Sequence, residues 1–256
     1  MQSNIMVNEE QLSNAPIKEA VIDIQIDFDQ DQPNFDYQSL SKKIPEEYTK
    51  REPISEAHVA LEINTKGESL FNNRDLGITG YRAENPKSGF VVQFRKTGMT
   101  VSKLPPYENW NSFKNEAKRL WSLYKETIPD YKLSRLAVRY INEIEIPFVN
   151  GNQAIDFDDY LINSPKTPSG MSTVVSEFFS RIVIPYPELG ANVIAIQALK
   201  DITDSHLIVI LDTDVYRTNV TGLSEIEMWD FFDQLRSLKN ETFKGSLTEK
   251  TMELFK

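Results

Sequence analysis

The chain has 256 residues, of which 40% are hydrophobic and none is cysteine, and it carries 38 acidic residues against 28 basic ones. The missing cysteines exclude disulfides, thiolate metal sites and thiol nucleophiles, and the net charge of −10 argues against binding nucleic acid through its phosphates. The first residues form no signal peptide and no apolar run is long enough to span a bilayer, so we expect a cytoplasmic protein without a membrane partner.

The sequence of the first half of the chain predicts a series of strands followed by one long helix. Residues 1–14 are polar and aperiodic, and we expect a disordered tail there. In residues 15–130, alternation of apolar and polar residues predicts strands, and apolar spacings of three or four predict helices. The expected elements are a strand at 20–28, a short helix at 35–50, strands at 57–64, 78–83, 90–95 and 99–104, and a helix at 108–127.

The second half, residues 131–256, repeats this pattern. Its expected elements are a long strand at 135–146, a short acidic helical turn at 156–161, strands at 173–184, 192–199, 206–212 and 215–219, and helices at 224–243 and after 246. A capping box of Ser224 and Glu227 marks the start of the long helix, and Gly245 is expected to end it. A second capping box, Ser246 and Glu249, is expected to open the last helix.

Both halves therefore read strand, helix, three or four antiparallel strands and long helix. Each long helix carries Trp-x-x-Phe near its start, at Trp110 and Phe113 and again at Trp229 and Phe232. We predict an α+β fold made by internal duplication, with antiparallel sheets, helices packed on one side, and the halves joined as one structural unit. This element order resembles the TATA-box-binding-protein-like architecture, a resemblance that carries no function with it.

Few residues suggest catalysis, and we assign no catalytic residue and no cofactor. The two histidines, His58 and His206, fall on predicted strands and are expected to be structural. Asp212 and Asp214 end a strand as D-x-D, so they are candidate metal ligands, although this pattern is also common in turns. A further acidic cluster is expected to cap the short helical turn; it comprises Asp156, Asp158 and Asp159.

The strand at 135–146 is the most unusual segment. Its alternation places Tyr140 and Asn142 on the apolar face, where a buried amide needs hydrogen-bond partners, and Arg135 and Arg139 on the other face. These four residues are the candidate ligand- or partner-binding site. The arginines would either hold the sheet together with Glu143 and Glu145 or bind an anion. An E-x-E-x-K metal motif is incomplete here, because Pro147 replaces the lysine.

The same segment carries a family resemblance. The R-x-x-x-R-Y-x-N motif from Arg135 to Asn142, the P-I-x-E segment at 16–19 and Y-x-x-W-x-x-F at 107–113 resemble a sporadically distributed family of uncharacterised prokaryotic proteins. The resemblance covers residues 14 to 243 and implies no assigned activity. A patchy distribution is typical of mobile or defence-associated genes.

Three functions remain open at this point. The first is a non-enzymatic binding or regulatory protein, such as an immunity, antitoxin or defence-associated partner of another protein, and homo-oligomers stay open as well. The second is a sensor or carrier of a small anionic ligand, with Arg139 as the anchor and Arg135 as a second candidate. The third is a metal-dependent enzyme that acts on phosphate esters through Asp212 and Asp214, with Glu143 and Glu145 as further candidates.

Overall fold

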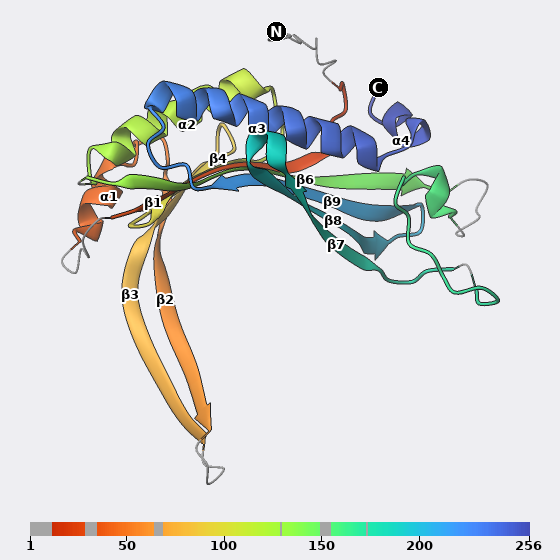
Figure 1. The fold of residues 1–256 in the computed structure, drawn as a ribbon, viewed down its shortest axis with the longest axis horizontal. Helices are drawn as coiled ribbons and strands as arrows, with labels where there is room; N and C mark the ends of the chain where they lie inside the picture. The colour runs from red at the N-terminus through yellow and green to blue at the C-terminus, as the bar shows by residue number, and fades with distance from the viewer. Residues whose placement is uncertain (1–11, 29–34, 64–68, 129, 149–154, 173) are drawn as a thin grey trace.

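The fold is a single antiparallel sheet with helices on it. The computed structural model describes residues 12–28, 35–63, 69–128, 130–148, 155–172 and 174–256, with the backbone alone at 56–63 and 69–76. Within these residues nine strands form one sheet in the order β2-β3-β4-β5-β1-β6-β9-β8-β7. The two long helices, α2 and α3, lie along the same face of this sheet (Figure 1).

The elements follow the chain as two runs. The first run comprises β1 (Ile17–Asp27), α1 (Tyr37–Lys43), β2 (Lys50–Ile63), β3 (Ser69–Asn85), β4 (Phe90–Arg95), β5 (Gly98–Lys103) and α2 (Trp110–Lys125). The second comprises β6 (Lys132–Pro147), the 3-10 turn η1 (Phe157–Asp159), β7 (Phe179–Tyr186), the 3-10 turn η2 (Pro187–Leu189), β8 (Ala191–Ile202), β9 (His206–Thr218), α3 (Glu225–Ser246) and α4 (Glu249–Glu253). The expectation of a mixed α+β protein with antiparallel strands is confirmed.

Several predicted boundaries are wrong for local reasons. The helix predicted at 35–50 ends at Lys43, because Ile44 precedes Pro45 and takes an extended conformation. The acidic helical turn predicted at 156–161 is present as the shorter η1, and the strand predicted at 215–219 is the end of β9. Gly245 does not end α3, which continues to Ser246, and Thr248 rather than Ser246 caps α4.

The strands β1 and β6 lie at the centre and hold the two runs together. They pair with each other antiparallel, while β1 also pairs with β5 and β6 also pairs with β9. The backbone is tight where β5 starts: Gly98 has φ +143°, and a Cβ there would lie 2.1 Å from the Ile24 carbonyl oxygen. Only glycine fits this approach, so the β4–β5 hairpin is fixed beside β1.

The helices bury apolar stripes against the sheet. The buried residues of α2 include Trp110, Phe113, Ala117, Leu120 and Tyr124, as the spacing predicts. Each fully buried aromatic or aliphatic side chain stabilises the fold by roughly 1.5–3 kcal/mol. The predicted capping box of Ser224 and Glu227 is also confirmed at the start of α3. The long helices are therefore anchored by burial and by a capped N-terminus.

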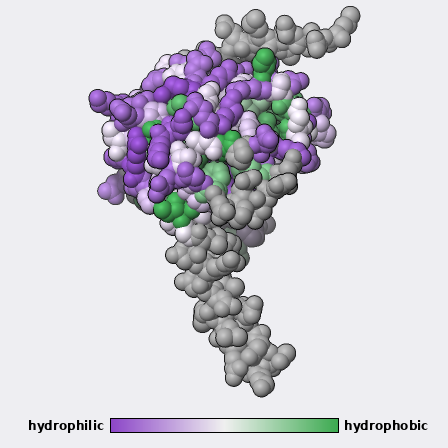
Figure 2. Space-filling view, turned by 90° about the vertical axis from the view of Figure 1, so that its left-hand side faces the viewer, coloured by the Kyte–Doolittle hydropathy of each residue, from purple (hydrophilic) through white to green (hydrophobic). Residues whose placement is uncertain are grey.

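The ends of the molecule differ in shape and surface. The strands β2 and β3 continue beyond the rest of the sheet as a two-stranded arm, and β7 forms the opposite edge (Figure 1). The end of the molecule away from β7 is largely hydrophilic, with small apolar patches (Figure 2). Among the described residues, no helix is both long and apolar enough to cross a membrane.

Candidate functional site

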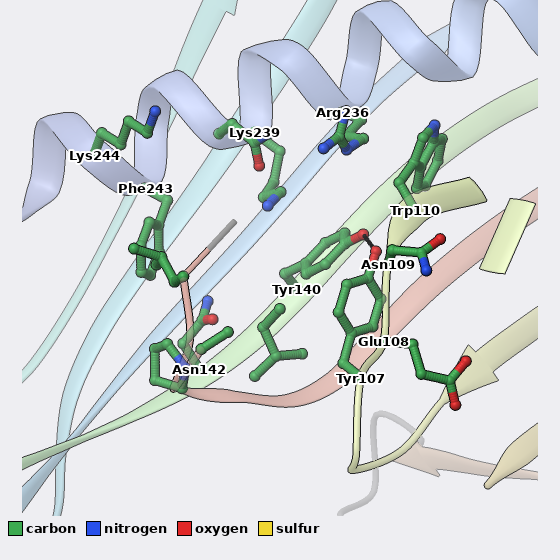
Figure 3. Close-up of a pocket in the computed structure, with 15 residues that line it drawn as sticks. Tyr107, Glu108, Asn109, Trp110, Tyr140, Asn142, Arg236, Lys239, Phe243 and Lys244 are labelled. Carbon is green, nitrogen blue, oxygen red and sulfur yellow. Dashed lines mark hydrogen bonds between the residues drawn. The ribbon is translucent and has the colours of Figure 1, made fainter. Parts of the chain in front are cut away.

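The strand β6 divides the four candidate residues between two faces of the sheet. Regular pairing along β6 keeps side chains alternating, so Arg135 and Arg139 lie on the face away from α3. Tyr140 and Asn142 lie on the other face, beneath α3 (Figure 3). The four residues therefore belong to two different environments rather than to one site.

On the arginine face, Arg135 joins two carboxylates from neighbouring strands. Its guanidinium donates to Asp23 at 2.9 Å and to Asp214 at 2.9 Å. Asp23 also accepts hydrogen bonds from Arg95 at 3.1 Å and from Thr100 at 2.7 Å. These contacts connect β4, β5, β1, β6 and β9 across the sheet, so Arg135 acts as a structural link.

Arg139 also pairs closely with an aspartate, Asp212 on β9. Its Nε and NH2 donate to the two carboxylate oxygens of Asp212 at 2.8 and 2.6 Å. These hydrogen bonds raise the pKa of the Arg139 guanidinium above its ordinary value. The Arg139 side chain is 45% exposed and that of Asp212 only 8%, so the pair stands at the surface with its carboxylate inside. An anion at this fork would first have to displace Asp212.

Asp214 has an unusual environment. Its Oδ2 accepts from Arg135, while its buried Oδ1 has no hydrogen-bond partner. Burial raises the pKa of the Asp214 carboxyl above its usual value, against the opposing effects of Arg135 and Arg139. Both members of the predicted D-x-D pair therefore accept hydrogen bonds from arginine. No group of three or more His, Asp or Glu residues in the described part of the chain could hold a metal ion.

The remaining acidic candidates are also engaged in the fold. Glu143 pairs with Lys18 at 3.7 Å and with Lys200. Asp156 caps η1 by accepting from the Asp158 amide at 3.0 Å, which confirms its predicted role. The other two acids pair with lysines, Asp158 with Lys166 and Asp159 with Lys250. None of these contacts resembles a catalytic arrangement.

The histidines lie far apart along the chain and on different strands. The His206 ring Nδ1 lies 3.1 Å from the Thr203 hydroxyl and 2.9 Å from the Ser205 hydroxyl, in the turn before β9. His206 and Glu145 both line a surface pocket. His58 is on β2, and its side chain lies outside the described residues.

On the face toward α3, Tyr140 and Asn142 line a cavity of about 190 Å³ (Figure 3). The Tyr140 hydroxyl lies 2.7 Å from that of Tyr107, and Asn142 donates to the Leu211 carbonyl at 3.1 Å. From above, the Lys239 ammonium reaches to 3.8 Å from the centre of the Tyr140 ring. The buried amide thus has a hydrogen-bond partner, and the cavity has a cation in its wall.

The edge strand β7 was predicted as a strand, but its exposure was not. Ile182, Val183 and Ile184 are 45%, 47% and 42% exposed, and Phe179 is 68% exposed. In the described part of the chain β7 pairs with β8 alone. The signal in the sequence is Pro185, because proline inside a strand is confined to edges and bulges.

The direction of the backbone groups of β7 follows from its pairing. The Phe178 carbonyl accepts from the Leu199 amide at 3.1 Å, in register with the β7–β8 ladder. Hydrogen bonding alternates along an antiparallel strand, so residues 180, 182 and 184 bond to β8, and residues 179, 181, 183 and 185 face outward. Pro185 has no amide proton, so the open edge presents three amides and four carbonyls.

Comparison with known proteins adds no identification: no family model matches the chain, and no curated protein matches it.

Proposed function

We propose that this is a non-enzymatic binding protein that takes an extended segment of another protein along the open edge of β7. The observation that carries this proposal is the combination of outward backbone groups with the exposed side chains of Ile182, Val183 and Ile184. A row of unpaired amides and carbonyls is a template for an added strand. Added strands gain affinity from main-chain hydrogen bonds and specificity from alternate side chains.

The charge of the chain favours a particular kind of partner. The net charge of −10 repels a second copy and attracts a protein with a basic surface. The β-branched side chains on β7 favour an apolar, extended segment opposite them. We therefore propose a basic protein that presents such a segment, as expected for an immunity, antitoxin or defence-associated partner.

The charge pairing around β6 supports this proposal over the two alternatives. An anion carrier anchored by Arg139 would need a fork that already binds Asp212. A metal-dependent phosphate esterase would need Asp212 and Asp214, which both accept from arginines. Because Arg95, Arg135 and Arg139 each pair with an aspartate, this face also offers little net positive charge to a nucleic acid.

The arrangement of the sheet supports a duplicated origin. We propose that the two runs are related halves, each laying its strands outward from the centre, β5-β4-β3-β2 from β1 and β9-β8-β7 from β6. The Trp-x-x-Phe pairs are buried near the start of α2 and α3, at Trp110 and Phe113 and at Trp229 and Phe232. Membership of the sporadically distributed prokaryotic family stays a proposal that rests on the motifs of β6.

A pair of substitutions at one outward position tests the binding edge. Arg181→Pro removes an outward amide, whereas Arg181→Ala removes the same side chain and keeps that amide. Tagged wild type and both variants are expressed in the native cells, and the proteins that copurify are quantified. We expect a basic protein to copurify with the wild type and with Arg181→Ala, and to be at least tenfold depleted with Arg181→Pro.

The contrary outcomes are equally specific. Equal recovery of the same partner with Arg181→Pro would contradict strand addition at β7. Recovery of the chain with itself alone, lost in Arg181→Pro, would show that the edge joins two copies rather than a different protein. Recovery of no partner by the wild type would count against a binding function.

A further inference from the structure

We infer that the segment added along β7 carries a lysine or arginine beyond its apolar residues, and that this side chain docks in the groove between η2 and α3. The inference rests on the proposed strand addition and names the kind of sequence that the edge selects. The groove begins where β7 ends, because Pro187 and Glu188 of η2, which follow Tyr186 directly, form one of its walls.

The apolar side chains of β7 lead toward this groove. Ile184 lies opposite Val193 of β8, which is buried in the core beneath α3. Residues that lie opposite each other in paired strands share a face, so Ile184 and Ile182 stand on the helix-covered face, although they remain 42% and 45% exposed. Tyr186 follows on the same face and packs against the core. A segment beside β7 therefore meets an apolar row that ends at the groove.

The groove itself has an apolar base and a volume of about 600 Å³. Leu189 and Leu223 line it half-buried, and the ring of Phe231 lines it almost fully buried. The guanidinium of Arg217 lies over this ring, 5.0 Å from its centre. The base can therefore pack against the aliphatic stem of an incoming side chain.

The charge of the groove is negative. Three carboxylates line it, those of Glu188, Glu227 and Asp230. Arg217 is the single base among the lining residues. Glu227 accepts from the amide and the hydroxyl of Ser224, and these hydrogen bonds lower the pKa of its carboxyl below the usual value. Glu188 and Asp230 are exposed, and neither has an ion-pair partner within the described residues. The fold thus leaves negative charge in the groove without neutralising it.

A lysine or arginine matches both properties of the groove. Its stem packs on the apolar base while its charged head reaches the carboxylates. In the described part of the chain no group of three or more acids could hold a metal ion, so the carboxylates here are spaced for a larger cation. A strand rises about 3.3 Å per residue, which places the cation roughly two to six residues beyond the residue that faces Ile184.

A second copy of this chain does not supply such a cation. If two β7 strands paired antiparallel, the residues just before one β7 would lie beside η2 of the other. Residues 174–178 contain one acid, Glu177, and no base. Two segments of like charge would then meet, so the groove favours a different protein that carries a base at this place.

Selection of peptides tests the inference. A phage-displayed library of random linear segments of about twelve residues, long enough to span β7 and η2, is selected on the purified full chain and on Glu188→Gln/Asp230→Asn. On the wild type we expect enriched sequences with alternating apolar residues and a lysine or arginine beyond one end. On the variant the apolar alternation should remain and the basic residue should no longer be enriched.

Fluorescence anisotropy of the synthetic consensus peptide measures the effect. Neutralising both groove acids should weaken its binding about threefold to tenfold, as expected for ion pairs at a surface. The control Glu177→Gln/Asp204→Asn removes the same charge from exposed acids at the other end of β7, and should change the affinity by less than about twofold. A consensus peptide with alanine in place of its basic residue should bind the wild type as weakly as the full peptide binds the groove variant.

Three results would overturn the inference. Equal weakening in the groove variant and the control would mean that net charge, and not the groove, holds the peptide. Enriched sequences without a basic residue, whose binding Arg181→Pro abolishes, would remove the inference and leave strand addition standing. Enrichment of no sequence, or of sequences that bind Arg181→Pro unchanged, would remove the inference and strand addition together.

Discussion

The centre and the edge of the sheet treat their polar groups in opposite ways. On the central strand β6, Arg135 and Arg139 have aspartate partners on β1 and β9. On the edge strand β7, backbone groups and the side chains of Ile182 and Val183 face outward. The difference teaches that charged residues which stand out in a sequence can be fully paired inside the fold. An ordinary apolar strand can instead keep exposed side chains and open backbone groups.

The largest effect on stability is expected when Arg135, which links the strands at the centre of the sheet, is replaced. Arg135→Ala removes the cation that Asp23 and Asp214 share; Asp23 keeps its hydrogen bond from Arg95, whereas Asp214 loses its hydrogen-bonded cation. We expect a loss of about 2–3 kcal/mol in the free energy of unfolding, since an uncompensated, partly buried charge is costly. Urea unfolding measures it, with Arg181→Ala on β7 as the control at less than about 0.5 kcal/mol. Equal losses in the two variants would remove the distinction.

A smaller loss of stability is expected for Arg139, which lies four residues further along the same face of β6. Arg139→Ala removes both donors from the carboxylate of Asp212, whose side chain is almost fully buried. We expect the free energy of unfolding to fall by about 1–2 kcal/mol, because the Arg139 side chain is 45% exposed and its removal lets water reach the Asp212 carboxylate. Arg139→Lys keeps the charge without the fork and should recover part of the loss. Full stability of Arg139→Ala would favour a binding role for this arginine.

The pH dependence of stability at the centre should be altered by Asp214→Asn. Because the pKa of Asp214 is raised by folding, the native state binds more protons than the unfolded state between the two pKa values. The free energy of unfolding of the wild type therefore falls as the pH rises through this window, starting near pH 4. Asparagine does not titrate, so the variant should gain relative to the wild type over the same range. Parallel curves in urea unfolding from pH 3.5 to 7 would contradict the assignment.

The smallest effect on stability is expected at the edge. Arg181→Pro removes an amide that faces away from β8, so the ladder between β7 and β8 stays intact. We expect a change of less than about 1 kcal/mol in the free energy of unfolding, measured beside Arg181→Ala. Ile182→Pro provides the contrast, since that amide bonds to β8 and its loss should cost clearly more. Similar costs at 181 and 182 would mean that the outward assignment is wrong.

The sequence predicts what depends on local periodicity. Alternation along β6 places Arg139 and Tyr140 on opposite faces, and the spacing of Trp110 and Phe113 identifies the buried face of α2. It does not predict partners that are distant along the chain. Asp23 lies 112 residues from Arg135, and their contact depends on β1 and β6 being neighbours in the sheet.

The candidate sites show the same limit. Lys239 stands on the apolar side of a helix whose spacing is plain in the sequence, yet only the packing of α3 on β6 brings it to Tyr140. The exposure of β7 follows from its place at the end of the strand order, which local patterns do not fix. Pro185 is the one local sign of that edge.

Amide-resolved hydrogen exchange on β7 is the most direct test of the binding edge. In the isolated protein we predict that the amides of 179, 181 and 183 exchange fast while those of 180, 182 and 184 are protected by β8. Adding the basic protein recovered with the wild type should protect the first set. Protection of all six amides before any partner is added, or fast exchange at 179, 181 and 183 in the complex, would contradict the account.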